Sequence, residues 1–290
     1  NASLAFARAT RMDFIKSMPN GMYAVEDWGV VSDYSQIAAG GAASVVKSPI
    51  VTAVDWKTIR PRDVMDGAFG RELDHLARLV AGAGPDLPVI ATVFSPLTIA
   101  KKLCPNGFET YLATERGAVE SALEAITTTM RAFARRAIDL GCAGVFFAIQ
   151  DATPAVGAET YAALGRPYDL ATLEGARDGW CNAIHLHGDD VLFEAVADYP
   201  VQVLNWHIGA GLGTLGVYGV LLYQAWMDRS ARARRARVRA GEAETRDYLD
   251  APDRARIMTA ALLIVGALLV FLTGWNGGEL VYQWAVNVAH

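Results

Sequence analysis

The stretch CNAIHLHGDDVLFEAVADYPVQVLNWH, residues 181–207, decides the fold class. Two short apolar runs, Ala183–Leu186 and Val201–Trp206, each lead into a histidine, and a segment of helical character, Val191–Ala197, lies between them. This order of strand, polar tip, helix and strand is typical of a parallel β/α unit. In such units the carboxyl ends of the strands meet at one edge of the sheet, where ligands bind.

Three of the five histidines in the chain fall at the ends of these two strands. His185 and His187 are two positions apart, so their side chains point to the same face of a strand. Imidazole nitrogens are common ligands of zinc and of other divalent transition metals. We therefore predict a metal site at which His185, His187 and His207 bind zinc or another divalent metal. The alternative is a set of rim histidines that are hydrogen-bonded to carboxylates and bind no metal.

The residues before this stretch repeat the same alternation. Apolar strands are expected at Asp13–Lys16, Leu87–Phe94 and Gly144–Ile149, with amphipathic helices at Arg71–Val80 and Val119–Leu140 between them. Short apolar strands alternating with helices predict a parallel sheet covered on both faces. The pattern provides about five β/α units, whereas a closed barrel of this class needs about eight.

Polar residues at the predicted strand tips are candidates for chemistry. Gln150 and Asp151 directly follow one strand, so we predict Asp151 and His207 as catalytic residues and Gln150 as a substrate contact. Lys102 lies near the start of a predicted helix, where free backbone N–H groups favour an anionic ligand, although a surface lysine is the alternative. Tyr23 follows the first visible strand and is a further predicted substrate contact.

Composition divides the chain near position 207. Residues 1–206 carry 17 Lys and Arg against 24 Asp and Glu, whereas residues 207–290 carry nine, all of them Arg, against seven. This change predicts two domains, residues 1–207 and 208–290. The three cysteines show neither CxxC spacing nor a disulfide framework, which is typical of a protein from the cytoplasm.

The second domain contains two uncharged apolar runs, Ile208–Trp226 and Ile257–Trp275. Each is close to the length of about 20 residues that a helix needs to cross a bilayer, and each ends on a tryptophan. We therefore expect two transmembrane helices in contact with membrane lipid. The arginines between the runs indicate a cytoplasmic loop, and because no aromatic residues are interleaved with them we expect no nucleic-acid partner.

Three segments together resemble the uroporphyrinogen decarboxylase family, which includes porphyrinogen decarboxylases and corrinoid:coenzyme M methyltransferases. They are LPVIATVFSPLTIAKKL (87–103), GCAGVFFAIQDA (141–152) and IHLHGDDVLFEAVADYPVQVLNWH (184–207). The resemblance implies a (β/α)8 TIM-type barrel, of which residues 4–207 would supply about strands two to six. A homodimer could then complete an open barrel.

The family motifs are matched in part. Porphyrinogen decarboxylases have Phe-Ser-Asp after an early strand, but here Ser17 is followed by Met18, and Lys102 stands where the family has tyrosine. The methyltransferases bind zinc through His-x-Cys-Gly, which His185-Leu186-His187-Gly188 matches with histidine for cysteine. The resemblance thus implies an impaired enzyme acting on a tetrapyrrole as a decarboxylase, or on a methyl donor as a metal-dependent methyltransferase.

The ending TGWNGGELVYQWAVNV, residues 273–288, resembles a family of small bacterial integral membrane proteins. This second resemblance implies a protein of the bacterial inner membrane that carries a barrel portion of cytoplasmic type. It also offers an alternative function, a non-catalytic integral membrane protein with a remnant of a barrel. Such a chain would arise from a gene fusion, a frameshift or an assembly error near His207.

Overall fold

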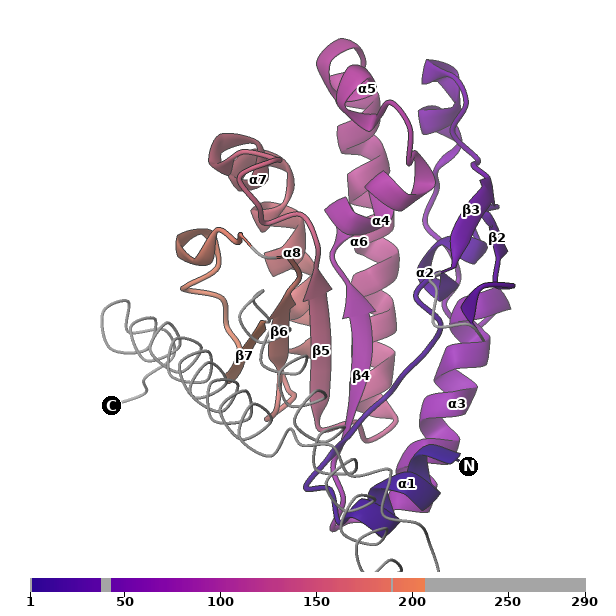
Figure 1. Ribbon diagram of the computed structural model, residues 1–290, viewed down its shortest axis with the longest axis vertical. Coiled ribbons are helices and arrows are strands. Elements are labelled where there is room, and N and C mark those ends of the chain that lie inside the picture. Colours follow the sequence, from indigo (N-terminus) through magenta and orange to yellow (C-terminus); the bar gives the residue numbers. More distant parts are fainter. Residues whose placement is uncertain (1, 38–42, 189, 207–290) are drawn as a thin grey trace, which may run out of the picture. The chain divides into compact units, whose positions relative to one another are not determined.

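The computed structural model describes residues 2–37, 43–188 and 190–206, and its main sheet has five parallel strands (Figure 1). The strands are β1 (Ile15–Lys16), β4 (Val89–Phe94), β5 (Gly144–Ile149), β6 (Ala183–Leu186) and β7 (Val203–Trp206). They pair in the order β1-β4-β5-β6-β7, each parallel to the next. This sheet is one half of an α/β barrel, as the sequence predicts.

Helices connect the strands, and β2 (Val31–Asp33) and β3 (Ser44–Lys47) form a separate antiparallel pair. The longer helices are α1 (Ala2–Thr10), α3 (Gly67–Ala83), α4 (Pro96–Leu103), α6 (Arg116–Asp139) and α8 (Arg166–Leu173). The shorter ones are α2 (Tyr23–Glu26), α5 (Phe108–Thr114), α7 (Ala158–Leu164), η2 (Ala53–Thr58), η3 (Glu174–Ala176) and η4 (Phe193–Ala195). In Figure 1, α4, α5 and α7 lie beyond the carboxyl ends of the strands.

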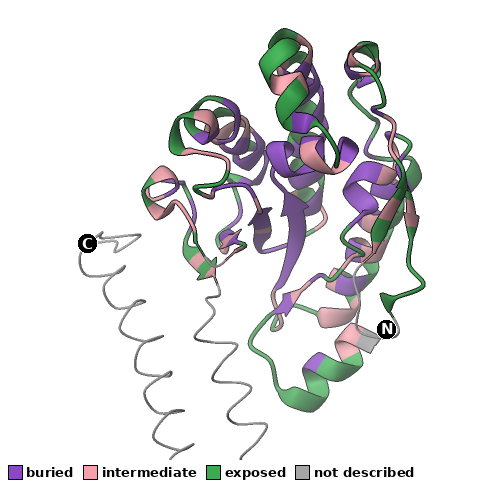
Figure 2. Ribbon diagram, turned by 45° about the horizontal axis from the view of Figure 1, so that its top comes forward, coloured by how far each residue is buried: buried purple, intermediate pink, exposed green. Residues whose placement is uncertain are grey.

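The two faces of the sheet differ in burial because successive side chains alternate between them. One face, which includes Ala91, Val93 and Phe147, is completely buried, and α3 and α6 contact β4 and β5 there. Figure 2 shows this core as a continuous buried layer. On the opposite face Lys16 and Phe146 are only partly buried, so in the described part of the chain this face is less covered than the prediction of two covered faces requires.

The start of α3 shows how a tertiary contact sets a boundary. The periodicity predicts a helix from Arg71, but α3 begins at Gly67. The Asp27 carboxylate accepts the backbone N–H groups of Ala68 and Phe69, at 2.9 and 3.1 Å, which satisfies two donors of the first turn. Gly67 has φ +59°, and a Cβ atom there would collide with Asp27.

The segment between the two histidine-bearing strands is less regular than predicted. A helix over Val191–Ala197 was expected, but only the single 3-10 turn η4 forms. The residues of η4 are not fully buried, although Val191, Leu192 and Phe193 pack against the core and Val196 is buried within it. The following strand is also shorter, since β7 begins at Val203 rather than at Val201.

The sequence predicts membrane-spanning helices, and the described helices can be compared with that prediction. Among the helices of residues 2–37, 43–188 and 190–206, none combines the length and apolar character needed to cross a bilayer. The two expected spans, 208–226 and 257–275, lie outside the described residues. The assignment of residues 208–290 to a separate domain stays a prediction.

The aromatic cluster around Phe69 gives a test of the core. Phe69 is fully buried and packs against the rings of Tyr23, Trp28 and Phe133. Phe69→Ala should lower the free energy of unfolding by about 3–5 kcal/mol, measured by urea denaturation, because it leaves a cavity among these rings. Phe6→Ala, at a 61% exposed site, should change it by no more than about 0.5 kcal/mol. Similar losses in the two variants would contradict this assignment of the core.

Candidate active site

Polar side chains gather where β4 and β5 end. Ser95 and Pro96 follow β4 and start α4, so the helix projects Thr98 toward the end of the neighbouring strand. Thr98 Oγ1 donates to Asp151 Oδ2 at 2.7 Å and accepts the backbone N–H of Gln150 at 3.1 Å. These two bonds join α4 to the tip of β5. They orient Asp151 at the edge where parallel sheets bind their ligands.

Asp151 is a buried carboxylate with a charged partner. It is 6% exposed, and its Oδ1 lies 3.1 Å from Lys101 Nζ. The same ammonium lies 3.5 Å from Glu109 Oε1 on α5. Asp151 therefore keeps both a hydrogen bond and an ion pair, which offset the cost of burying its charge. It is held in one orientation and can act on a ligand through its fixed negative charge.

Lys102, one residue further along α4, has a different environment. Its Nζ donates to the backbone oxygen of Gly21 at 3.0 Å and lies 4.2 Å from the centre of the Phe94 ring. Within the described residues no carboxylate lies within 4 Å of this ammonium. Burial lowers the pKa of Lys102 from 10.5 to about 8, and the charge of Asp151 opposes that shift. A substantial part of its population is therefore neutral in mildly alkaline solution.

Tyr23 is enclosed rather than presented to a ligand. Its side chain is completely buried, its hydroxyl donates to the Thr92 oxygen at 2.7 Å, and its ring packs against Phe94 and Phe133. Burial raises the pKa of this hydroxyl, and the charge of Glu72 adds to the shift. The packing places Tyr23 in the core, and its role as a substrate contact stays a prediction.

A buried carboxyl group beside this region has no counterpart among the predicted residues. Asp169 on α8 is 0% exposed, and its Oδ2 accepts the hydroxyls of Tyr161 at 2.6 Å and Tyr199 at 3.0 Å. Burial raises the pKa of Asp169 to about 7, while the hydrogen bonds from Tyr161 and Tyr199 act in the opposite direction and the charge of Asp151 raises it further.

Histidines occupy the end of β6. His185 stacks on the Phe146 ring, with ring centres 5.1 Å apart, and its Nδ1 lies 2.6 Å from Asn205 Oδ1 on β7. The His187 ring lies edge-on to His185, with 6.0 Å between ring centres. The two imidazoles are thus neighbours, as their spacing predicts.

Only part of the predicted metal site lies within the described residues. In the part of the chain that the structure describes, no group of three or more His, Cys, Asp or Glu side chains is placed to hold a metal ion. His207, the predicted third ligand and second catalytic residue, lies outside the described residues. The metal site and the catalytic role of His207 stay predictions.

The predicted residues thus fall into two groups. Asp151 and Gln150 lie at the end of β5, while Lys102, which was predicted near a helix start, lies in the last turn of α4. His185 at the end of β6 and His187 just after it lie side by side. Sequence reasoning missed Thr98 and Asp169. The polar residues in the Ser-Pro-x-Thr start of α4 were a signal for Thr98, but nothing in the local sequence indicates that Asp169 is buried.

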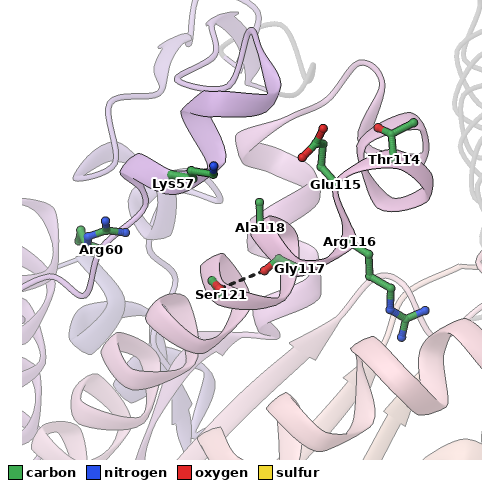
Figure 3. A pocket seen from close by; sticks show the side chains of 8 residues that line it. All are labelled: Lys57, Arg60, Thr114, Glu115, Arg116, Gly117, Ala118 and Ser121. Atoms are coloured by element: carbon green, nitrogen blue, oxygen red, sulfur yellow. Dashed lines mark hydrogen bonds between the residues drawn. The ribbon is translucent and has the colours of Figure 1, made fainter.

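A separate pocket lies away from both groups (Figure 3). It is lined by Lys57, Arg60, Thr114, Glu115, Arg116, Gly117, Ala118 and Ser121. Figure 3 shows the Arg116 side chain turned away from Lys57 and Arg60, and its Nε donates to Glu120 at 2.8 Å. None of the predicted site residues that the structure describes borders this pocket.

A family model for uroporphyrinogen decarboxylase (URO-D) matches residues 7–211, well over half of the chain. The chain belongs to the URO-D family. Among solved structures, a methyltransferase from Methanosarcina mazei is similar, with a TM-score of 0.57 and 16% sequence identity. That match covers 70% of this chain and 60% of the methyltransferase, so this chain spans less than two thirds of its neighbour. No curated protein matches the sequence.

These findings correct the expected localisation. The URO-D match runs to residue 211, past the expected junction at His207, and no membrane-protein family is found at the C-terminus. The match to the URO-D family overturns the prediction of a bacterial inner-membrane protein. The alternative of a barrel remnant carried by a membrane protein is likewise unsupported.

The buried Asp169 makes the stability of the URO-D domain depend on pH. In the unfolded chain this carboxyl ionises near pH 4, with a pKa of about 3.9, whereas in the folded chain it stays protonated up to about pH 7. The folded state therefore binds more protons in this interval, and the free energy of unfolding should fall by up to about 1.4 kcal/mol for each pH unit as pH rises.

Urea denaturation of Asp169→Asn should show a shallower decline between about pH 4 and pH 7 than the wild type, because an amide does not titrate. Asp74→Asn, at a side chain 79% exposed, should keep the wild-type slope. Identical slopes for the wild type and Asp169→Asn would show that Asp169 is ionised in the folded protein.

Proposed function

We propose that this URO-D family member is a metal-dependent, methyltransferase-like enzyme that acts on a small methyl donor at the carboxyl edge of its sheet. The observation that carries the proposal is the orientation of His185. Its Nδ1 lies 2.6 Å from Asn205 Oδ1, and in the proposed site Nδ1 carries the hydrogen of this contact. Histidines that bind metals usually donate their second ring N–H to an oxygen in this way, which sets the tautomer and directs the other nitrogen to the metal.

The donor set fits a divalent transition metal. His185 and His187 supply two adjacent imidazoles, and His207 would supply a third at the next strand tip. Such a metal would lower the pKa of a substrate thiol and stabilise it as a thiolate. Phe146 stacks on His185 and shields one face of the imidazole from water. Asp151, held by Thr98 and Lys101, would orient the substrate through its fixed charge.

Decarboxylation of a tetrapyrrole is the second candidate. Lys101 and Lys102 at the same edge favour a substrate that carries carboxylates. Against it, the position at which porphyrinogen decarboxylases carry aspartate is Met18, which is 77% exposed and has no acidic group. We therefore place methyl transfer first. A homodimer that completes the open half-barrel is also proposed, and gel filtration of the full-length chain tests it.

Metal content tests the proposed function directly. The purified chain, loaded with zinc and dialysed, should retain about one zinc ion per chain by mass spectrometry, and His185→Ala or His187→Ala should lose it. Asn205→Ala should weaken zinc binding by about 10- to 100-fold, because His185 loses its orienting acceptor. His75→Ala, on α3, is the matched control and should retain zinc. A wild-type chain that holds no more zinc than the His185→Ala, His187→Ala double variant would refute the proposal.

A further inference from the structure

A pocket of about 560 Å³ lies between the segment around η2 and the first residues of α6 (Figure 3). Lys57 and Arg60 line one wall, and Gly117 and Ala118 line the wall that α6 provides. The volume falls within the range of about 300–1,000 Å³ that is usual for small-molecule sites. The pocket is therefore large enough for a ligand of several non-hydrogen atoms.

The two cations of this pocket are not compensated within the described residues. The Lys57 ammonium has no ion-pair partner there, and the Arg60 guanidinium donates only to the carbonyl oxygen of its neighbour Ile59, at 3.3 Å. Arg116, in contrast, is paired with Glu120 and turned away from the pocket in Figure 3. Lys57 and Arg60 thus keep most of their N–H donors for a ligand.

Buried neighbours hold the wall that carries these cations. Trp56 and Ile59, which directly precede Lys57 and Arg60, are 0% and 3% exposed. The Trp56 ring packs edge-on against the Phe108 ring of α5, with ring centres 5.9 Å apart. The backbone beneath both basic side chains is therefore fixed before a ligand arrives, which lowers the entropy that binding costs.

The opposite wall leaves room beside the two cations. A Cβ atom at Gly117 would meet nothing within 4 Å, and Ala118 adds only a methyl group. One carboxylate, that of Glu115, also lines the pocket, and it lies more than 4 Å from the Lys57 ammonium. The lining is therefore uncrowded on the α6 side and carries a net positive charge.

We propose that this pocket binds a small organic phosphate monoester, with the phosphate between Lys57 and Arg60 and the organic part over Gly117 and Ala118. A phosphate monoester carries about −1.5 to −2 charges near neutral pH, which matches two unpaired cations better than one carboxylate does. The Arg60 guanidinium can bond two phosphate oxygens at once. This site is separate from the proposed methyl transfer, since none of the described residues of that site borders the pocket.

Calorimetric titration of the folded full-length chain with phenyl phosphate tests the charge requirement. At about pH 7.5, where the monoester is mostly a dianion, about one molecule should bind per chain. Lys57→Gln and Arg60→Gln should each weaken binding at least about tenfold, because each removes a charge-assisted contact. Arg78→Gln is the matched control, since Arg78 is a side chain 77% exposed on α3, and it should retain the wild-type affinity.

Filling the pocket separates this site from general attraction of anions. Gly117→Leu should abolish binding while it keeps every charge, and it should not lower the urea midpoint, because leucine favours a helix more than glycine does. Ala132→Leu, at an exposed position of α6 outside the pocket, should bind as the wild type does.

Three results would overturn the proposal. They are a wild-type chain that shows no saturable binding, an unchanged affinity in Gly117→Leu, and a loss in Arg78→Gln as large as that in Lys57→Gln. Displacement of phenyl phosphate by phenol, which lacks the charge, would equally refute the assignment of an anion site. Each result can be read whatever the zinc content, so a failure here is distinct from a failure of the proposed function.

Discussion

The parallel pairing of β4 with β5 is the constraint on which the rest of the structure depends. The register aligns Phe94 with Ala148, so that both strands end at the same level and the residues after them meet. Backbone hydrogen bonds set this register, and the fully buried side chains on the helix-covered face stabilise it, since a slip by one residue would turn them toward the other face. Thr98 and Asp151 come within 2.7 Å of each other only because these two strands end together.

The same constraint explains why much of the fold could be predicted from the sequence. β5 forms over Gly144–Ile149, the predicted range, because a short apolar run between polar tips has few other ways to be buried. The start of α3 could not be predicted, since it depends on Asp27, which is distant in the chain. The predicted membrane localisation was wrong: it rested on the apolar composition of residues 208–290, and the URO-D family match over residues 7–211 overturns it.

The candidate site could be predicted in its positions but not in its electrostatics. The local sequence is sufficient to predict Asp151 at a strand tip, but it predicts Lys102 near a helix start, whereas Lys102 lies in the last turn of α4. The Lys102 amine contacts the carbonyl oxygen of Gly21, 81 positions earlier in the chain, and the ring of Phe94. The pKa of the Asp169 carboxyl likewise depends on a hydrogen bond from Tyr199, 30 positions away. Such partners are brought together by the tertiary fold and leave no pattern in the neighbouring residues.

Asp27 at the start of α3 has a consequence for how this half-barrel assembles. The carboxylate that accepts the N–H groups in the first turn of α3 belongs to Asp27, the residue after α2. These hydrogen bonds therefore form only when the segment that carries Asp27 has packed against α3. An isolated peptide of α3 would fray at this end, and the loop and the helix would gain order in a single cooperative event. One carboxylate, that of Asp27, thus couples the residues that follow α2 to the helix that begins at Gly67.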